Sequence, residues 1–97
     1  MALSEAAQAR RRKRARDYFR EYRYGITTEQ FQARLDKQGH VCAICGGRTP
    51  NRELDVDHDH KTGAIRGLLC HYCNTGIAKF RDDPALLQRA AAYLKGA

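Results

Sequence analysis

Four cysteines in two short pairs are the first residues of this chain whose types and spacing indicate chemistry. Cys42 and Cys45 are two residues apart, as are Cys70 and Cys73, and 24 residues lie between the pairs. This spacing lets both sulfurs of a pair reach one ion at about 2.3 Å, and two such pairs are typical of a tetrahedral zinc site. Because four thiolates complete the coordination shell, we predict a structural zinc, with the reactive chemistry elsewhere.

Two other interpretations of the cysteines are weaker. Disulfides could form in three pairings, but they need an oxidising compartment that nothing in the sequence indicates. Cys42 and Cys45 together with His58 and His60 imitate a Cys2His2 finger. In such fingers three to five residues separate the histidines, whereas here one does, and Cys70 and Cys73 would have no role.

The segment between the cysteine pairs carries a second kind of chemistry. Residues 55–60 hold three aspartates and two histidines, and Asn74 directly follows the last cysteine. Carboxylate and amide oxygens suit a hard divalent cation such as Mg²⁺, and a histidine can take a proton from water near neutral pH. On a basic chain this set favours metal-dependent hydrolysis of a phosphodiester. The plainer interpretation is a polar hairpin tip whose carboxylates pair with arginines.

The charge of the chain predicts a polyanionic partner. The formal charge is +7, and residues 1–37 contribute +5 of it, with eight basic side chains at positions 10–23. Such a cluster most often binds nucleic acid, although a solvated helix face or a localisation-like signal is the alternative. A membrane surface fits less well, because the cluster has no deep apolar stripe opposite it. The residues predicted to contact DNA are Arg10, Arg11, Arg12, Arg14, Arg16, Lys61, Arg66 and Lys79.

Two helices are predicted before the first cysteine pair. Ser4 caps the first helix, which runs to about Tyr24 and ends at Gly25. Thr27 and Gln30 form a capping box for a second helix over residues 26–38. An apolar face on the first helix is expected to dock against the rest of the chain, leaving the arginines outside. That face consists of Ala15, Tyr18, Phe19 and Tyr22.

A hairpin and two more helices are predicted after the first cysteine pair. Residues 53–57 and 64–69 have strand patterns around a polar loop, and a helix runs from Cys70 or Cys73 to Phe80. Asp83 and Pro84 begin a last helix with an expected buried stripe at Leu87, Ala90, Ala91 and Leu94. The sequence has no run of roughly 18 apolar residues and no secretory signal, which predicts an intracellular protein without a membrane span.

Four motifs, taken together, resemble the phage recombination endonuclease VII family, which belongs to the His-Me finger (HNH) nucleases. They are YGIT at 24–27, GHVCAICG at 39–46, LDVDHDHKTG at 54–63 and RGLLCHYCN at 66–74. The resemblance covers roughly residues 24–83, and the joint pattern of CxxC, DHDH and CxxCN is highly specific.

The resemblance implies an α+β fold: a small zinc-bound ββα-metal domain (His-Me finger, treble-clef-like) with flanking helices. Residues 1–24 would be a basic N-terminal helix and residues 25–97 the nuclease domain. His58 would be the general base that activates water, and Asp57 and Asn74 would hold Mg²⁺ or Mn²⁺. His60 matches a second active-site histidine. Neighbouring residues of a regular strand face opposite sides, so the strand must bend or end between Asp57 and His58.

The expected function is therefore a metal-dependent DNA endonuclease or nickase with low sequence specificity. A zinc-ribbon DNA-binding or assembly protein without catalysis is the alternative, and an RNA-directed nuclease is a third. Besides DNA, a homodimer or a phage DNA-processing complex would supply the partners. The resemblance places the protein in the cytoplasm of a bacterial host, as a phage or prophage product.

Overall fold

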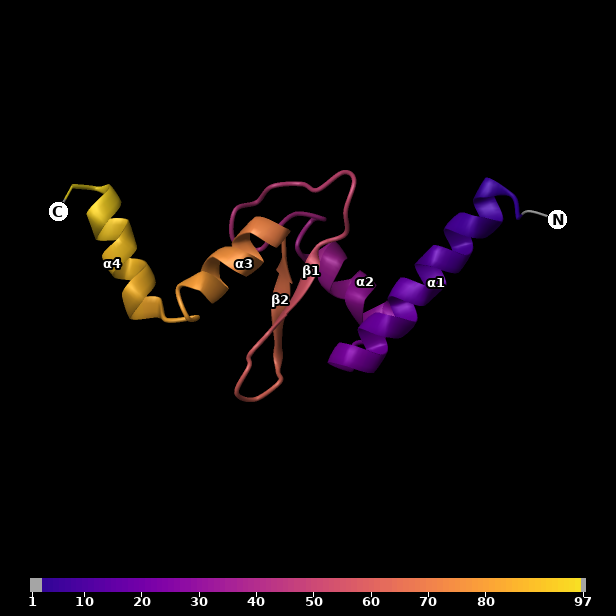
Figure 1. Ribbon diagram of the computed structural model, residues 1–97, viewed down its shortest axis with the longest axis horizontal. Coiled ribbons are helices and arrows are strands. Elements are labelled where there is room, and N and C mark those ends of the chain that lie inside the picture. Colours follow the sequence, from indigo (N-terminus) through magenta and orange to yellow (C-terminus); the bar gives the residue numbers. More distant parts are fainter. Residues whose placement is uncertain (1–2, 97) are drawn as a thin grey trace.

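A two-stranded antiparallel hairpin occupies the middle of the molecule, with helices on both sides of it (Figure 1). The computed structural model describes residues 3–96 of the chain. Its elements are α1 (Glu5–Tyr24), α2 (Thr28–Lys37), β1 (Asp55–His58), β2 (Ile65–Leu69), α3 (His71–Lys79) and α4 (Pro84–Leu94). The α+β class is confirmed. Within residues 3–96, no helix combines the length and the apolar character needed to cross a membrane.

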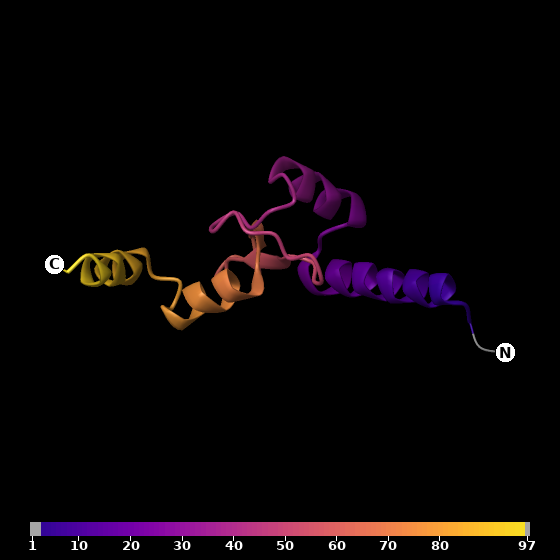
Figure 2. The same cartoon turned by 90° about the horizontal axis from the view of Figure 1, so that it is seen from above.

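The molecule is elongated, with extents of 63 × 28 × 24 Å. Helices α1 and α4 point away from the hairpin in opposite directions, and they form the two ends of the long axis (Figures 1 and 2). The buried core lies between them, where α2, the hairpin and the first cysteine pair meet. It consists of Ile26, Phe31, Cys42, Leu54, Val56, Leu68, Leu69 and Cys70.

The helix ends agree with the predicted capping residues. Ser4 accepts a hydrogen bond from the amide of Ala7 at the start of α1, and Gly25 ends that helix with a φ of 69°. Thr27 and Gln30 form the capping box of α2. Both strands begin slightly later than predicted, at Asp55 and Ile65.

The prediction that the apolar face of α1 docks is wrong. Tyr18 is 71% exposed and Tyr22 79% exposed, and their rings stack on each other at the surface. Ala15 and Phe19 are exposed as well. The side that contacts the body of the molecule is instead the one that carries Arg20, which is only 8% exposed.

Arg20 attaches α1 to the core through both its charge and its flat shape. Its guanidinium lies 3.7 Å from the centroid of the Phe31 ring, within the range of a cation–π contact. It also pairs with Asp17, one turn back on α1, and with Glu53, just before β1. A planar cation can stack and form ion pairs at the same time, which explains how an arginine takes the buried position.

The predicted burial of the α4 stripe is also wrong. None of residues 84–94, all of which the structure describes, is buried, and Leu94 is 83% exposed. The helix begins as predicted, with Asp83 as its cap and Pro84 in its first turn. It then leads away from the hairpin (Figure 1). Of the stripe, Leu87 and Ala90 are half-buried, and Ala91 and Leu94 are exposed.

The hairpin contains a β-bulge at the place where the sequence requires a bend. Asp57 pairs with Gly67, but His58 pairs with Ile65, so Arg66 is an extra residue in β2. β1 ends at His58. A register shift therefore lies between Asp57 and His58, but its extra residue belongs to β2, so the expectation that β1 itself bends or ends there stays a prediction. In an unbroken ladder Arg66 would face away from Asp57, because it neighbours Gly67.

Gln38 joins the end of α2 to the cysteine pair and to β2. Its side-chain amide donates hydrogen bonds to the carbonyls of Val41 and Leu68, each at 2.9 Å. Its carbonyl accepts a hydrogen bond from the amide of Leu68 at 3.0 Å. The side chain thus replaces a neighbouring strand beside Leu68, which is fully buried.

We expect Gln38→Ala to lower the free energy of unfolding of the zinc-loaded protein by about 2–4 kcal/mol, because several buried backbone groups lose their partners. Urea denaturation followed by circular dichroism measures this change. Gln32→Ala is the matched control, since Gln32 is exposed on the same helix and bonds to Asp36 alone in the described structure. Its effect should stay within about 0.5 kcal/mol. Equal effects of the two variants would contradict the role given to Gln38.

Candidate functional site

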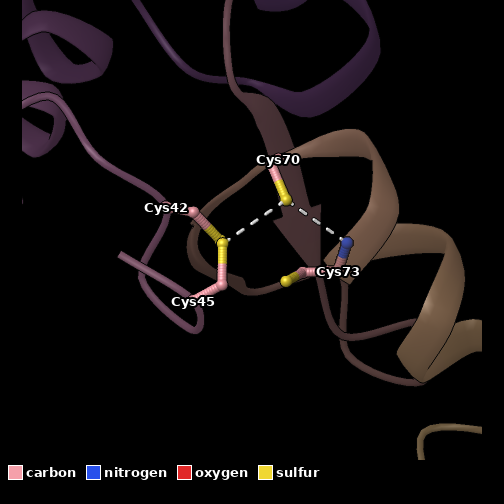
Figure 3. Close-up of side chains that lie close together, drawn as sticks. All are labelled: Cys42, Cys45, Cys70 and Cys73. Carbon is pink, nitrogen blue, oxygen red and sulfur yellow. Dashed lines mark hydrogen bonds between the residues drawn. The ribbon is translucent and has the colours of Figure 1, made fainter. Parts of the chain in front are cut away.

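The four cysteine side chains converge on one point (Figure 3). Their sulfur atoms all lie within 4.8 Å of one another, and the sulfurs of Cys45 and Cys70 are 3.8 Å apart. A tetrahedral ion with bonds of about 2.3 Å requires sulfur–sulfur edges of about 3.8 Å. The donor set and its spacing therefore fit a structural zinc ion.

Backbone amides around the cysteines favour the thiolate forms. The amide of Ile44 donates to the sulfur of Cys42, that of Gly47 to Cys45 and that of Cys73 to Cys70, at 3.3–3.4 Å. A tight turn produces the first two bonds, and Gly46 closes it with a φ of 69°. Cys70 is the N-cap of α3, so the positive end of that helix also faces the cluster.

Two thiols of the cluster have pKa values that are shifted in opposite directions. Burial raises the pKa of Cys42, but hydrogen bonds from the amides of Cys70, Cys45 and Ile44 bring it down to about 6. Burial and the neighbouring thiols raise the pKa of Cys73 to about 12. One thiolate therefore forms readily while its neighbour keeps its proton. A bound dication changes this balance, because it allows all coordinating thiols to be deprotonated together.

Asp57 is buried, and its carboxylate is held by Arg66. The exposed fraction of Asp57 is 7%. The Nε atom of Arg66 donates to one carboxylate oxygen at 2.8 Å, and a terminal nitrogen donates to the other at 2.9 Å. The same terminal nitrogen donates to Asp82 at 3.2 Å. These hydrogen bonds with two carboxylates raise the pKa of Arg66 above its already high usual value.

Asn74 lies in the first turn of α3 and faces a different carboxylate, that of Asp55. Its side-chain nitrogen donates to Asp55 at 3.3 Å, and Asp55 also contacts His71 and Arg52. The side-chain oxygen of Asn74 accepts no hydrogen bond from residues 3–96. In that described range no hydrogen bond joins Asn74 to Asp57 either. The two predicted metal ligands thus come from adjoining elements, and each has a protein partner.

His58 and His60 stand side by side at the end of β1. Their ring centroids are 4.6 Å apart, and the ring of Tyr24, at the end of α1, lies 5.3 Å from that of His58. His58 is partly exposed, and the side chain of His60 is 68% exposed. The Nε2 atom of His60 is 3.9 Å from Asp82. Water can therefore reach both imidazole rings at this edge of the hairpin.

The structure does not bring all of these groups close enough together to bind one ion. Among residues 3–96, no group of three or more histidine, cysteine or carboxylate side chains besides the four cysteines converges closely enough to share a metal. Asp59 has another task, since it accepts hydrogen bonds from the amides of Lys61 and Thr62 and so shapes the loop between the strands. These backbone bonds lower the pKa of Asp59.

An open groove of about 1390 Å³ adjoins Asn74. Its walls come from α1, the segment before β1, and the start of α3. Its basic and imidazole lining residues include Arg16, His40, Arg48, Arg52 and His71. Sequence reasoning missed the cluster of Asp55, His71 and Arg52, although the two-residue period of β1 already placed Asp55 on the same strand face as Asp57.

The residues predicted to contact DNA are spread over several elements. Arg10, Arg11, Arg12, Arg14 and Arg16 are exposed on α1, and Lys61 and Lys79 are exposed on the hairpin loop and at the end of α3. Arg16 lies 3.6 Å from Glu53. Arg66 differs from the others, because it forms ion pairs with two carboxylates, those of Asp57 and Asp82.

Comparison with known proteins identifies relatives for most of the chain. The family described as recombination endonuclease VII matches residues 17–96. The Gene 59 protein of Mycobacterium phage D29 is 50% identical over 74 residues, which are 74% of this chain and 45% of that protein. The Gene 59 protein of Mycobacterium phage L5 is 42% identical over 73 residues, which are 73% of this chain and 44% of that protein. The chain spans less than half the length of these curated relatives.

One solved structure also resembles this chain closely enough to be informative. It is the crystal structure of the ββα-Me type II restriction endonuclease Hpy99I, with a TM-score of 0.53 and 31% sequence identity. The match covers 81% of this chain and 47% of the restriction enzyme. The hairpin followed by α3 is thus the ββα unit that the sequence predicts.

Proposed function

This chain belongs to the recombination endonuclease VII family, and we propose that it is a metal-dependent DNA endonuclease or nickase of the His-Me finger type. The single observation that carries the proposal is the combination of one zinc-type cysteine cluster with Asp57, His58 and Asn74 on the hairpin and α3 beside it. The similarity to a ββα-Me endonuclease supports the same class of reaction. Residues 25–97 would form the nuclease domain, with residues 1–24 as a basic helix.

Asp57 and Asn74 would hold a Mg²⁺ or Mn²⁺ ion. Their carboxylate and amide oxygens are the donor types that these cations prefer, and the oxygen of Asn74 is without a hydrogen-bond partner among residues 3–96. When bound, such an ion would polarise the scissile phosphate and stabilise the leaving 3′ oxygen. The donor chemistry therefore fits the ion, provided that Arg66 gives up the carboxylate of Asp57.

His58 would act as the general base. It is partly exposed, so water can reach it, and the Tyr24 and His60 rings on either side restrict its orientation. It would take a proton from the water that attacks phosphorus, leaving a 5′-phosphate and a 3′-hydroxyl. His60 would contact the phosphate or the metal beside it.

Contacts to the DNA backbone would come from the exposed arginines of α1 together with Lys61 and Lys79. Phosphate contacts fix position without reading bases, so we propose low sequence specificity and binding that weakens steeply with salt. Arg16 and the groove beside Asn74 link the basic helix to the proposed metal ligands.

Plasmid cleavage tests the proposal. We expect zinc-loaded protein to nick or linearise supercoiled DNA when Mg²⁺ or Mn²⁺ is added and to leave it intact without either ion. Dialysis rather than a chelator should remove the divalent ions, and zinc content should be measured afterwards, so that loss of the structural ion is not mistaken for loss of the catalytic one. Binding of DNA without cleavage in any metal would favour the non-catalytic zinc-ribbon module. Cleavage of RNA in preference to DNA would favour the RNA-directed nuclease.

A further inference from the structure

Arg66 is hydrogen-bonded to the carboxylate of Asp57, which is one of the two proposed ligands of the catalytic metal. Both oxygens of Asp57 accept hydrogen bonds from the guanidinium, at 2.8 and 2.9 Å. A bidentate pair of this kind is among the strongest single contacts that a carboxylate makes in a protein. Because Asp57 is only 7% exposed, little water competes with the guanidinium for it.

The β-bulge is the reason that this pair exists. Arg66 is the extra residue of β2 between the partners of Asp57 and His58. The bulge breaks the strict alternation of side chains, and it lets Arg66 reach the face of the sheet on which Asp57 lies. A regular hairpin of the same sequence would leave Asp57 buried without a cation.

Asp82 offers the guanidinium a second partner. It accepts from the terminal nitrogen of Arg66 at 3.2 Å, and it lies in the turn between α3 and α4. Arg81 and Asp82 both have left-handed backbone conformations, with φ of 59° and 52°. Such conformations are costly for residues other than glycine, so the local structure holds this carboxylate beside Arg66 at some expense in stability.

We propose that Arg66 is a positioning residue that competes with the divalent cation for Asp57. Without the cation, the guanidinium neutralises Asp57 and holds its oxygens in place. When the cation binds, Arg66 releases Asp57, keeps its contact with Asp82 and becomes available to a phosphate of the DNA. The inference rests on the proposed function, because it takes Asp57 to be a metal ligand.

The exchange must occur by movement, not by loss of a proton. An arginine stays protonated at every pH that a protein tolerates, and two carboxylates beside Arg66 strengthen that tendency. A divalent ion that approaches these two oxygens is repelled by the guanidinium, which already uses one lone pair on each of them. Metal affinity is therefore lower than the ligand set alone would give, and it depends on Arg66.

Mn²⁺ binding to zinc-loaded protein without DNA tests the inference, with free Mn²⁺ measured by electron paramagnetic resonance. We expect Arg66→Met to tighten Mn²⁺ binding at least 10-fold. Lys13→Met is the control, because it removes one positive charge from a carboxylate, Asp17, that lies on α1 outside the proposed metal site. If only the overall charge of the protein mattered, the two variants would change the Mn²⁺ affinity equally. We expect the control to change affinity by no more than about 3-fold.

Arg66→Lys covers the case in which Arg66→Met does not fold. A lysine keeps the charge but cannot contact both oxygens in a fork, so we expect it to tighten Mn²⁺ binding by about 3-fold. The zinc content and the thermal melting curve identify folded variants. Mn²⁺ should raise the melting temperature of folded Arg66→Met more than that of the wild type.

The two hypotheses fail in different ways. If Arg66→Met leaves Mn²⁺ affinity unchanged or weakens it, while Asp57→Asn still abolishes metal-dependent cleavage, the competition is refuted and the nuclease stands. If Arg66→Met binds Mn²⁺ tightly and adding Asp57→Asn to it changes nothing, Asp57 is not a ligand and both are refuted. A purely structural role for Arg66 predicts weaker Mn²⁺ binding in its variants, which is the opposite of the expected result.

Discussion

Cys70→Ala is expected to leave the chain without zinc and unfolded under conditions in which the wild type is folded. Binding of a structural zinc contributes on the order of 10 kcal/mol or more to folding, which is comparable with the whole stability of an ordinary domain. The core described within residues 3–96 contains eight buried hydrophobic residues, and two of them, Cys42 and Cys70, would be sulfur ligands of the zinc. Cys70 also caps α3 through its sulfur. Zinc content by mass spectrometry and helicity by circular dichroism measure both consequences.

Tyr72→Ala is the control for this experiment. Tyr72 lies between Cys70 and Cys73, but it is 86% exposed, so its removal should leave zinc content and helicity unchanged. A folded Cys70→Ala protein that contains no zinc would contradict the structural role of the metal. Retention of zinc by three cysteines and a water molecule would contradict the closed four-sulfur site.

His58→Ala is expected to slow DNA cleavage by about 10²–10⁴-fold, which is the usual contribution of a general base. The fold should persist, because His58 is partly exposed and lies at the last position of β1, where the ladder ends. Single-turnover cleavage of a labelled duplex at saturating Mg²⁺ measures the rate, and unchanged zinc content confirms the fold.

Tyr93→Ala is the surface control for His58→Ala. Tyr93 is 79% exposed on α4, and it does not line the groove beside Asn74. We expect its rate to stay within about 2-fold of the wild type, as for a surface residue outside the site. A wild-type rate for His58→Ala would remove His58 from the mechanism and leave His60 as the candidate.

The parts of the fold that could be predicted are those determined by neighbours in the sequence. The caps at Ser4, Thr27 and Asp83 each satisfy helix amides within two or three residues, and Gly25 ends its helix by its own conformational freedom. The spacing within each cysteine pair is as local as these, whereas the meeting of the two pairs, 24 residues apart, was expected from the four-ligand preference of zinc. For the local features the sequence window contains the whole physical cause.

The parts that could not be predicted depend on partners distant in the sequence. Arg20 is buried because Phe31 and Glu53 meet it, and Gln38 is constrained by Leu68, 30 residues later. Helix α4 follows the same logic, since an apolar helical pattern is predictable but whether another element buries it is not.

The candidate site likewise has a part that could be predicted from the sequence and a part that could not. The residue types at Asp57, His58 and Asn74 indicated a metal and a base, and the bend between Asp57 and His58 was required by strand alternation. The pairing of Asp57 with Arg66 needed the register of the hairpin, which one extra residue changes. Sequence patterns identify donors, whereas the competition for a donor appears only when both strands are placed.

The elongated shape also limits how much DNA one copy of residues 3–96 can cover. Its longest dimension is 63 Å, and at 3.4 Å of rise per base pair this corresponds to about 18 base pairs. Helices α1 and α4 define that length, since they project from opposite sides of the hairpin (Figure 2). A hydroxyl-radical footprint longer than about 18 base pairs on straight duplex would therefore indicate that more than one chain is bound to the DNA.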